Sequence, residues 1–430
     1  MNHYFHNIIE LGFILLHLLL FVINYHFSRK RLMHPAVLFS LIWFFILLLH
    51  LIFKLSILNL LFDLHLQTLV IIFFGTLSFS IGSFLITLLK EKRERKKFGD
   101  IYNNPNWLNY FSSKLQVIIL LITCLGLPYY IYQSYKIFLL SNIDNFFIGL
   151  RTELSYGDVD LGPEKYLTTV SYISMAFQQY CFYKKKSINN YFFLIISIST
   201  ALIYAVFTTG RGPILWVATI LIGMNFLHGK NFSFKRIIIT ISLFIVFFSI
   251  IGIFFGKGGN TEASFQDNLK SSSEVTSSYL VASVNALDLK LQQNIPPNYN
   301  GNNSLRFFKA LGQSAGFFKY EKVPELIQEF SFVPYSTNVY TIYYAYISDY
   351  GVPYALAMLA IFGMIQTLIY NKAIQTKNLR YSIYYSLTLY PLFMSFFQDI
   401  YISLLSTWLQ VIVITELLIL CNRIIFEKND

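Results

Sequence analysis

Two kinds of side chain in the polar segments of this chain could do chemistry: arginines that can bind phosphate, and carboxylates that can accept a proton. Arg211 lies in the short segment Thr208–Pro213, with a glycine on each side and apolar runs before and after it. A planar guanidinium can donate two parallel hydrogen bonds to phosphate oxygens. At a membrane edge Arg211 is therefore well placed for a lipid phosphate. The structural alternative is a positively charged anchor at a helix end.

Arg151 and Arg306 belong to longer polar segments. For Arg306 a solvated helix face competes with a binding role. For Arg151 the competing explanation is a surface ion pair, which is common and weak, with one of three nearby acids: Glu153, Asp158 or Asp160.

The carboxylates of interest are Glu329 and Asp349, which lie on either side of the pattern Asn338-Val339-Tyr340-Thr341. A positioned carboxylate can take a proton from a hydroxyl group in the transition state. Each could also be an ordinary interfacial acid. Asp349, close to Gly351 and Pro353, could instead satisfy backbone donors at the N-terminus of the apolar run that follows it.

Other site chemistry is sparse in the sequence. The chain has no His/Cys/Asp/Glu cluster with metal-ligand spacing, no phosphate-binding glycine loop and no Gly-x-Ser-x-Gly motif. We therefore expect any reaction to be independent of metal ions, and we expect no cofactor.

The elements that must position these residues are membrane helices. Of the 430 residues, 55% are hydrophobic and only 13% are charged, which is typical of an all-α polytopic integral membrane protein. A bilayer core of ~30 Å needs ~20 apolar residues per helix, and on that basis the sequence predicts about eleven spans. They lie near 7–27, 36–58, 67–89, 115–139, 166–183, 191–209, 213–228, 237–256, 350–370, 381–399 and 402–422.

The distribution of Lys and Arg predicts the orientation of the chain. Basic residues follow every second predicted span, for example at Arg29–Arg31 and Lys90–Lys97, and such connectors are cytoplasmic. The N-terminus is then outside and the C-terminus inside, with Ser141–Lys165 and Lys257–Ser348 extracytoplasmic. The net charge of +11 is accounted for by this topology, so we expect no nucleic-acid partner.

This topology divides the chain into an N-terminal membrane bundle of about eight helices (1–256), a large extracytoplasmic loop (257–348) and about three C-terminal helices (349–430). Within the loop, the apolar spacing predicts an amphipathic helix over Tyr279–Gln293. We expect Ser304 to cap a second short helix. Of the ionisable residues in the apolar runs, Lys54 can snorkel outward and Glu416 can pair internally.

Several of these patterns resemble the bacterial oligosaccharide repeat unit polymerases, which polymerise O-antigen and capsule in the Wzy-dependent pathway. The Asn338-Val-Tyr-Thr pattern, followed by Asp349-Tyr-Gly351 at the start of a span, carries the resemblance. The arginine turn Thr209–Gly212 is similar to one in that family, and Arg151 with Gly162 resembles its Arg-x10-Gly element. Arg306 departs from that element, because the residue eleven positions on is Phe317 and Gly316 is one short.

The resemblance implies a GT-C-like helical bundle in the bacterial inner membrane and an enzyme of the glycosyltransferase class. Its implied substrates are undecaprenyl-diphosphate-linked oligosaccharides, with the growing chain transferred to a new repeat unit. Arg211 and Arg151, and by extension Arg306, Asn338 and Tyr340, would bind the diphosphate and glycan. Glu329 is expected to be the base and Asp349 to have a structural or sugar-orienting role. A chain-length regulator and a flippase are the expected protein partners.

Two alternatives remain open at the level of sequence. A flippase for lipid-linked oligosaccharides is disfavoured because transporters tend to have paired repeats and short external loops. An O-antigen ligase shares the substrate and the architecture but relies on a loop histidine, and none of the eight histidines lies in 141–165 or 257–348.

Overall fold

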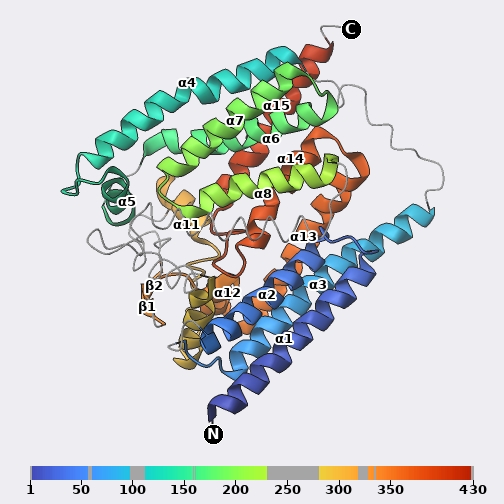
Figure 1. The fold of residues 1–430 in the computed structure, drawn as a ribbon, viewed down its shortest axis with the longest axis vertical. Coiled ribbons are helices and arrows are strands. Elements are labelled where there is room, and N and C mark those ends of the chain that lie inside the picture. Colours follow the sequence, from blue (N-terminus) through green and yellow to red (C-terminus); the bar gives the residue numbers. More distant parts are fainter. Residues whose placement is uncertain are drawn as a thin grey trace. The chain divides into compact units, whose positions relative to one another are not determined.

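The structure is a computed structural model that describes residues 2–56, 61–96, 112–157, 159, 161–229, 280–317, 328–333 and 336–427. These residues form helices joined by short connectors, with a single two-stranded hairpin among them (Figure 1). Seven of the described helices are long and apolar enough to cross a membrane: α1 (Asn2–Phe27), α2 (Pro35–Ser56), α3 (Leu66–Lys96), α4 (Ser113–Phe138), α7 (Ile188–Phe207), α13 (Val352–Thr376) and α15 (Leu405–Glu427). The chain is thus an all-helical, polytopic membrane protein, as its composition predicts.

Three further predicted spans coincide with helices that do not meet the same length and hydropathy criteria. They are α6 (Tyr166–Lys184), α8 (Arg211–His228) and α14 (Leu379–Phe393). α14 stops short of the predicted 399, two residues after Pro391, which has no N–H to continue the helical hydrogen bonds. The predicted span at 237–256 lies outside the described residues, so the number eleven stays a prediction.

The chain forms two compact units that interleave along the sequence. Unit 1 consists of 1–100, 274–371 and 391–406, and unit 2 of 101–273, 372–390 and 407–430. The predicted division into 1–256, 257–348 and 349–430 concerns which parts of the chain enter the membrane. It does not concern which parts pack together in space, and it stays a prediction. Each unit is described by itself below.

In unit 1, helices α1, α2 and α3 pack against one another (Figure 1). α13 runs along α3 in the same direction, because Gly75 faces Leu359, Phe79 faces Gly363 and Ser83 contacts Thr367. Close packing is possible because two glycines face the partner backbone. A Cβ at Gly82 would meet the carbonyl of Ala360, and one at Gly363 would meet the carbonyl of Phe79. The hydroxyl groups of Ser83 and Thr367 join the same two helices across 2.5 Å.

The parallel packing gives unit 1 a basic end. Arg29–Arg31 lie in the turn between α1 and α2, and α3 ends in the basic run Lys90–Lys96. His34, beside that turn, stacks on Phe84 of α3 at 5.9 Å and meets the ring of Tyr370, near the end of α13, at 5.2 Å. The second half of α3 and the C-terminal part of α13 therefore contact a residue beside the basic turn, and the starts of both helices lie toward the opposite end.

A helix over residues 280–292 occupies that opposite end. The predicted helix is confirmed, but it is buried nearly all round rather than amphipathic on a surface. Leu280 and Val281 pack with Leu61, while Ala282 and Ala286 pack with Val333 and Tyr340. The residues that look like a polar face in the sequence, Ser283, Asn285 and Asp288, are buried and hydrogen-bonded.

The rest of the described polar segment is folded onto the same unit. It includes α11 (Arg306–Ser314), the antiparallel pair β1 (Ser331–Phe332) and β2 (Ser336–Thr337), and α12 (Thr341–Tyr350). α12 is a separate helix before the predicted span. Its N-terminus is held by Thr341 N–H donating to the carbonyl of Phe397 at 2.9 Å. Its end is set by Gly351, which adopts φ 85° and so separates α12 from α13.

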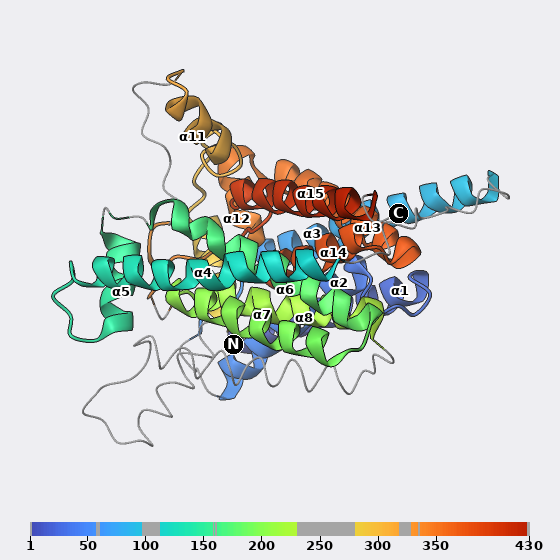
Figure 2. The same cartoon turned by 90° about the horizontal axis from the view of Figure 1, so that it is seen from above.

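Unit 2 contains α4, α5 (Phe146–Tyr156), the short 3₁₀ helix η2 (Gly162–Lys165), α6, α7, α8, α14 and α15. Helices α4, α6 and α7 contact one another, α8 contacts α6 and α7, and the four lie side by side in both views (Figures 1 and 2). Glu416 of α15 accepts hydrogen bonds from Arg380 at 2.6 Å and Tyr384 at 2.7 Å, which confirms its internal pairing.

Candidate functional site

The arginine turn in unit 2 is as tight as its sequence predicts. α7 ends at Phe207 and α8 begins at Arg211, with Thr209 in the left-handed region at φ 55° and Gly210 as the N-cap. Arg211 is therefore the first helical residue, where the helix dipole also favours an anion. Its side chain is buried.

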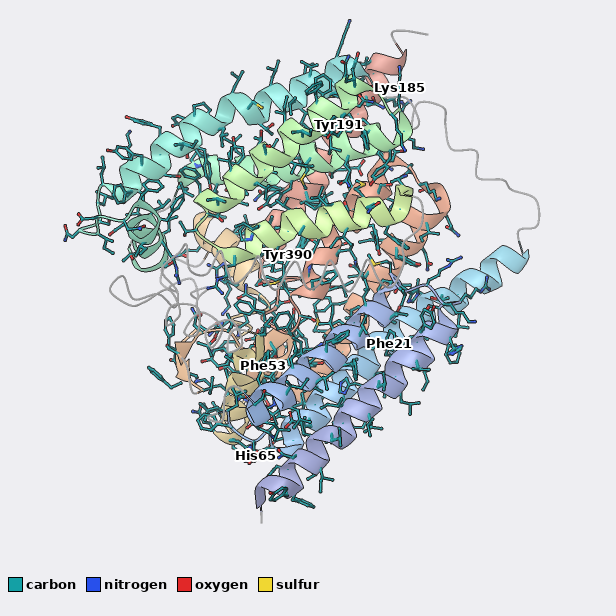
Figure 3. The ribbon with its side chains drawn as sticks, in the orientation of Figure 1. Phe21, Phe53, His65, Lys185, Tyr191 and Tyr390 are labelled. Carbon is teal, nitrogen blue, oxygen red and sulfur yellow. The ribbon has the colours of Figure 1, made fainter. Side chains whose placement is uncertain are left out.

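Gly212 has a packing reason that the sequence does not reveal. A Cβ at this position would meet the hydroxyl of Tyr390, whose ring stacks on Trp216 of α8 with centroids 4.8 Å apart. Tyr172 donates to the carbonyl of Pro213 at 3.1 Å. Figure 3 shows Tyr390 beside α8. This aromatic packing fixes the first turn of α8, and with it the position of Arg211.

Arg151 lies on α5 and is half-buried. Gly162, eleven residues later, has φ 70° and opens η2, which leads into α6. A left-handed backbone at this point favours glycine for conformational reasons alone. Asp158 and Asp160, two of the proposed ion-pair partners of Arg151, lie outside the described residues.

Asp349 of unit 1 is buried, and its carboxylate holds a loop in place. It accepts hydrogen bonds from the backbone N–H and side-chain amide of Asn303, and from the backbone N–H and hydroxyl of Ser304. The shortest of these are the two bonds from Ser304, at 2.7 Å each. The alternative of an N-terminal acid is wrong, because Asp349 lies in the last turn of α12.

The same contacts overturn the predicted helix cap. Because Ser304 is committed to Asp349, α11 begins at Arg306 with Leu305 as its N-cap and without a capping side chain. Arg306 is half-buried at the first position of α11, and burial lowers the pKa of its guanidinium.

Glu329 and Tyr340 are brought together beside the 280–292 helix. The Tyr340 hydroxyl donates to the backbone carbonyl of Glu329 at 2.6 Å and lies 2.7 Å from the hydroxyl of Ser331. Burial raises the pKa of Tyr340. The Glu329 carboxylate points to solvent, with its side chain 90% exposed and Lys290 Nζ at 3.6 Å. Asn338 follows β2 and is half-buried.

The predicted residues thus fall into two sets. Arg151 and Arg211 belong to unit 2, whereas Arg306, Glu329, Asn338, Tyr340 and Asp349 belong to unit 1.

Sequence reasoning missed a buried ionisable cluster in unit 1. Glu10 of α1, 1% exposed, lies 2.6 Å from Nδ1 of His50 and 2.7 Å from Nζ of Lys54. Lys54 also contacts Asp63 at 3.2 Å, so it does not snorkel as predicted. The other ring nitrogen of His50 lies 2.6 Å from Oδ1 of Asn285 in the 280–292 helix.

One turn further along that helix, Asp288 forms a second group with His65 and Thr68. The His65 Nδ1–H donates to Oδ2 of Asp288 at 2.8 Å, while the backbone N–H of His65 and the hydroxyl of Thr68 donate to Oδ1 at 2.9 and 2.6 Å. Asp288 is buried, but the His65 side chain is 52% exposed. Figure 3 shows His65 at the end of the α1–α3 group where the N-terminus lies.

One signal in the sequence could have found these residues. Glu10, His50 and Lys54 are ionisable residues within apolar runs, and such residues normally mark functional sites or internal pairs. Their partners cannot be deduced from spacing, since His50 and Asn285 are 235 positions apart. In the part of the chain that the structure describes, no group of three or more His, Cys, Asp or Glu side chains is arranged to hold a metal ion.

Comparisons of the chain with known protein families, with curated proteins and with solved structures gave no match. The function is therefore argued from the chemistry of the residues above.

Proposed function

We propose that the protein is a polymerase that joins undecaprenyl-diphosphate-linked oligosaccharide repeat units into a surface polysaccharide at the outer face of the bacterial inner membrane. The observation that carries this proposal is the position of the described residues between 280 and 349, which are 280–317, 328–333 and 336–349. They fold onto the end of unit 1 opposite its basic end, through the burial of the 280–292 helix and the hydrogen bonds of Asp349.

Charge distribution supports an extracytoplasmic location for that end. Under the positive-inside rule, Arg29–Arg31 and the basic end of α3 are cytoplasmic. α2 has 22 residues, and at 1.5 Å per residue a helix of that length spans about 33 Å, which is enough to cross the hydrocarbon core. His65 and the 280–292 helix then face outward, and the N-terminus is outside.

This location limits the chemistry. Nucleotide sugars are absent outside the cytoplasm, so an activated sugar must arrive anchored to a lipid with its diphosphate at the membrane face. Departure of the diphosphate needs charge neutralisation. Arg211, fixed at the first turn of α8, and Arg151 are proposed to supply it through bidentate hydrogen bonds. Because arginines take this role, polymerisation is expected to survive chelation by EDTA.

The proposal is tested by deleting the gene in its native host and analysing the surface polysaccharide by gel electrophoresis. A strain that displays single repeat units, and recovers the ladder when the wild-type gene is returned, supports a polymerase. An unchanged ladder would contradict it.

A flippase for the same lipid-linked oligosaccharide is a second candidate, favoured by the buried Glu10–His50–Lys54 cluster. Ionisable groups inside membrane helices are typical of proton-coupled transporters. The deletion strain separates the two functions, because loss of a flippase traps lipid-linked repeat units on the cytoplasmic side and leaves no surface product.

The structure also changes the argument about a ligase. The long polar segments contain no histidine, which disfavours a ligase, yet His65, from the short connector before α3, contacts the 280–292 helix. In the same experiment a ligase mutant would accumulate full-length polymer on its lipid carrier.

A further inference from the structure

We propose that His65, held by Asp288, is the general base that deprotonates the acceptor hydroxyl. The inference deepens the proposed function and rests on it. It replaces the expectation that Glu329 is the base, and its argument uses only contacts within unit 1.

The imidazole ring of His65 has a fixed orientation. An ionised carboxylate only accepts hydrogen bonds, so the contact of 2.8 Å with Asp288 places the proton of neutral His65 on Nδ1. Nε2 then carries the lone pair. A carboxylate that fixes the tautomer of a histidine in this way leaves the opposite nitrogen ready to accept a proton.

Asp288 is also rigid. Both of its oxygens are engaged, Oδ2 by the ring and Oδ1 by the hydroxyl of Thr68 and the backbone N–H of His65. The carboxylate is buried on a helix that is itself buried nearly all round. It cannot turn away from His65 without leaving a buried donor unpaired, which is unfavourable.

The His65 ring is accessible. The His65 side chain is 52% exposed, although its partner is only 6% exposed. The ring of His6 from α1 lies edge-on at 6.3 Å, and Thr68 of α3 faces Asp288. A ring needed only to tie helices together would be expected inside, as His50 is, with both of its nitrogens in contact.

The Glu329 carboxylate is not held in position in the way that His65 is. Its carboxylate is 90% exposed, and the ionic contact that reaches it, from Lys290, is 3.6 Å long. A general base contributes most when it is held within hydrogen-bonding reach of the proton it removes. His65 is held in position by its hydrogen bond to Asp288, whereas the Glu329 carboxylate is solvated.

The reaction then balances as follows. The oxygen of the acceptor hydroxyl attacks the anomeric carbon of the donor, and a new glycosidic C–O bond forms as the C–O bond to the diphosphate breaks. The electron pair of the broken bond leaves with undecaprenyl diphosphate. The hydroxyl proton moves to Nε2 of His65, and the resulting imidazolium is stabilised by Asp288 until it releases the proton to solvent.

The test uses membranes of the deletion strain, which hold its accumulated lipid-linked repeat units, mixed with each full-length variant purified in detergent. The key variant is His65→Asn, because the amide nitrogen of asparagine can reproduce the Nδ1–H donor to Asp288 but cannot act as a base. We expect a normal yield of folded protein and a loss of at least about a hundredfold in the initial rate of polymerisation. His65→Ala should lose as much and regain activity when imidazole is added.

His26→Asn is the matched control, since His26 lies exposed on α1 at the basic end, and it should polymerise as the wild type does. If the wild type makes no polymer from these membranes, the proposed function itself fails. If the wild type is active and His65→Asn retains more than half of its rate, the base is not His65. Loss in His65→Ala that imidazole does not restore, in a folded protein, would also overturn the inference.

Discussion

Asp349 and Asp288 are two of the buried carboxylates of unit 1, and they look alike by burial but differ in what they hold. The donors to Asp349 come from Asn303 and Ser304, and they tie a loop to the end of α12. Two of the donors to Asp288 also serve structure, but the third is the ring of His65, whose other nitrogen stays available. A buried acid can therefore hold a loop in place or form part of a reactive pair, depending on the residues that it contacts.

The largest effect on the protein is expected from removing the Asp349 carboxylate, which holds the loop in place. Asp349→Ala leaves the donors of half-buried Asn303 and buried Ser304 without this acceptor and should cost about 3–5 kcal/mol of folding free energy. Asp349→Asn keeps one acceptor oxygen and should lose less. The measurement is the yield and thermal unfolding midpoint of protein purified in detergent. A normally folded Asp349→Ala protein would remove the basis of the comparison.

A second, purely functional loss is expected at Arg211. Both Arg211→Ala and Arg211→Lys should abolish polymer at normal expression, because a point charge does not reproduce a bidentate guanidinium. The control is Lys185→Ala in the same unit, at the other end of α7, which should leave the ladder intact. Wild-type polymer from Arg211→Ala would refute the proposed diphosphate contact.

Asp288→Asn should have an intermediate effect. It distinguishes a residue that positions His65 from one that only stabilises the fold. The amide cannot accept from both sides, and it does not stabilise an imidazolium as a carboxylate does. We expect a loss of about 10–100-fold in kcat with KM little changed, in protein that still folds. A fall in folded yield without a change in kcat would show that Asp288 only stabilises the fold, as Asp349 does.

The smallest effect is expected at Glu329. Because its side chain is exposed and makes one long ionic contact, Glu329→Gln should change the polymerisation rate less than about twofold, well below the loss expected of a base. Complete loss of polymer, with His65→Asn active, would restore Glu329 as the base.

The sequence is sufficient to predict most of the helices, because apolar runs of membrane length have few alternatives. It also predicts the tight turn before Arg211 and the helix at 280–292. It does not show that this helix is buried, since Asn285 and Asp288 are polar and read as a solvated face until their partners on α2 and α3 are known. Helical spacing reports neighbours along one helix and contains nothing about residues 220 or more positions away.

The end of α12 illustrates a different limit. Asp349-Tyr-Gly351 reads equally well as the start of the apolar helix or the end of a preceding one. Gly351 decides for the end, because its φ of 85° with ψ of 178° is a backbone conformation that glycine adopts readily and other residues rarely do. The five contacts that Asp349 makes with Asn303 and Ser304 depend on a loop 45 residues upstream and are not deducible from spacing.

The comparison of the two carboxylates has meaning for function only if their end of unit 1 faces outward. The direct measurement is labelling of Phe317→Cys, an 82% exposed position after α11, by a membrane-impermeant maleimide in a variant whose three native cysteines are replaced. Arg29→Cys at the basic end is the control. We predict that intact spheroplasts label Phe317→Cys, and that Arg29→Cys reacts only after lysis. Labelling of Phe317→Cys only after lysis would contradict the extracytoplasmic site and the polymerase with it.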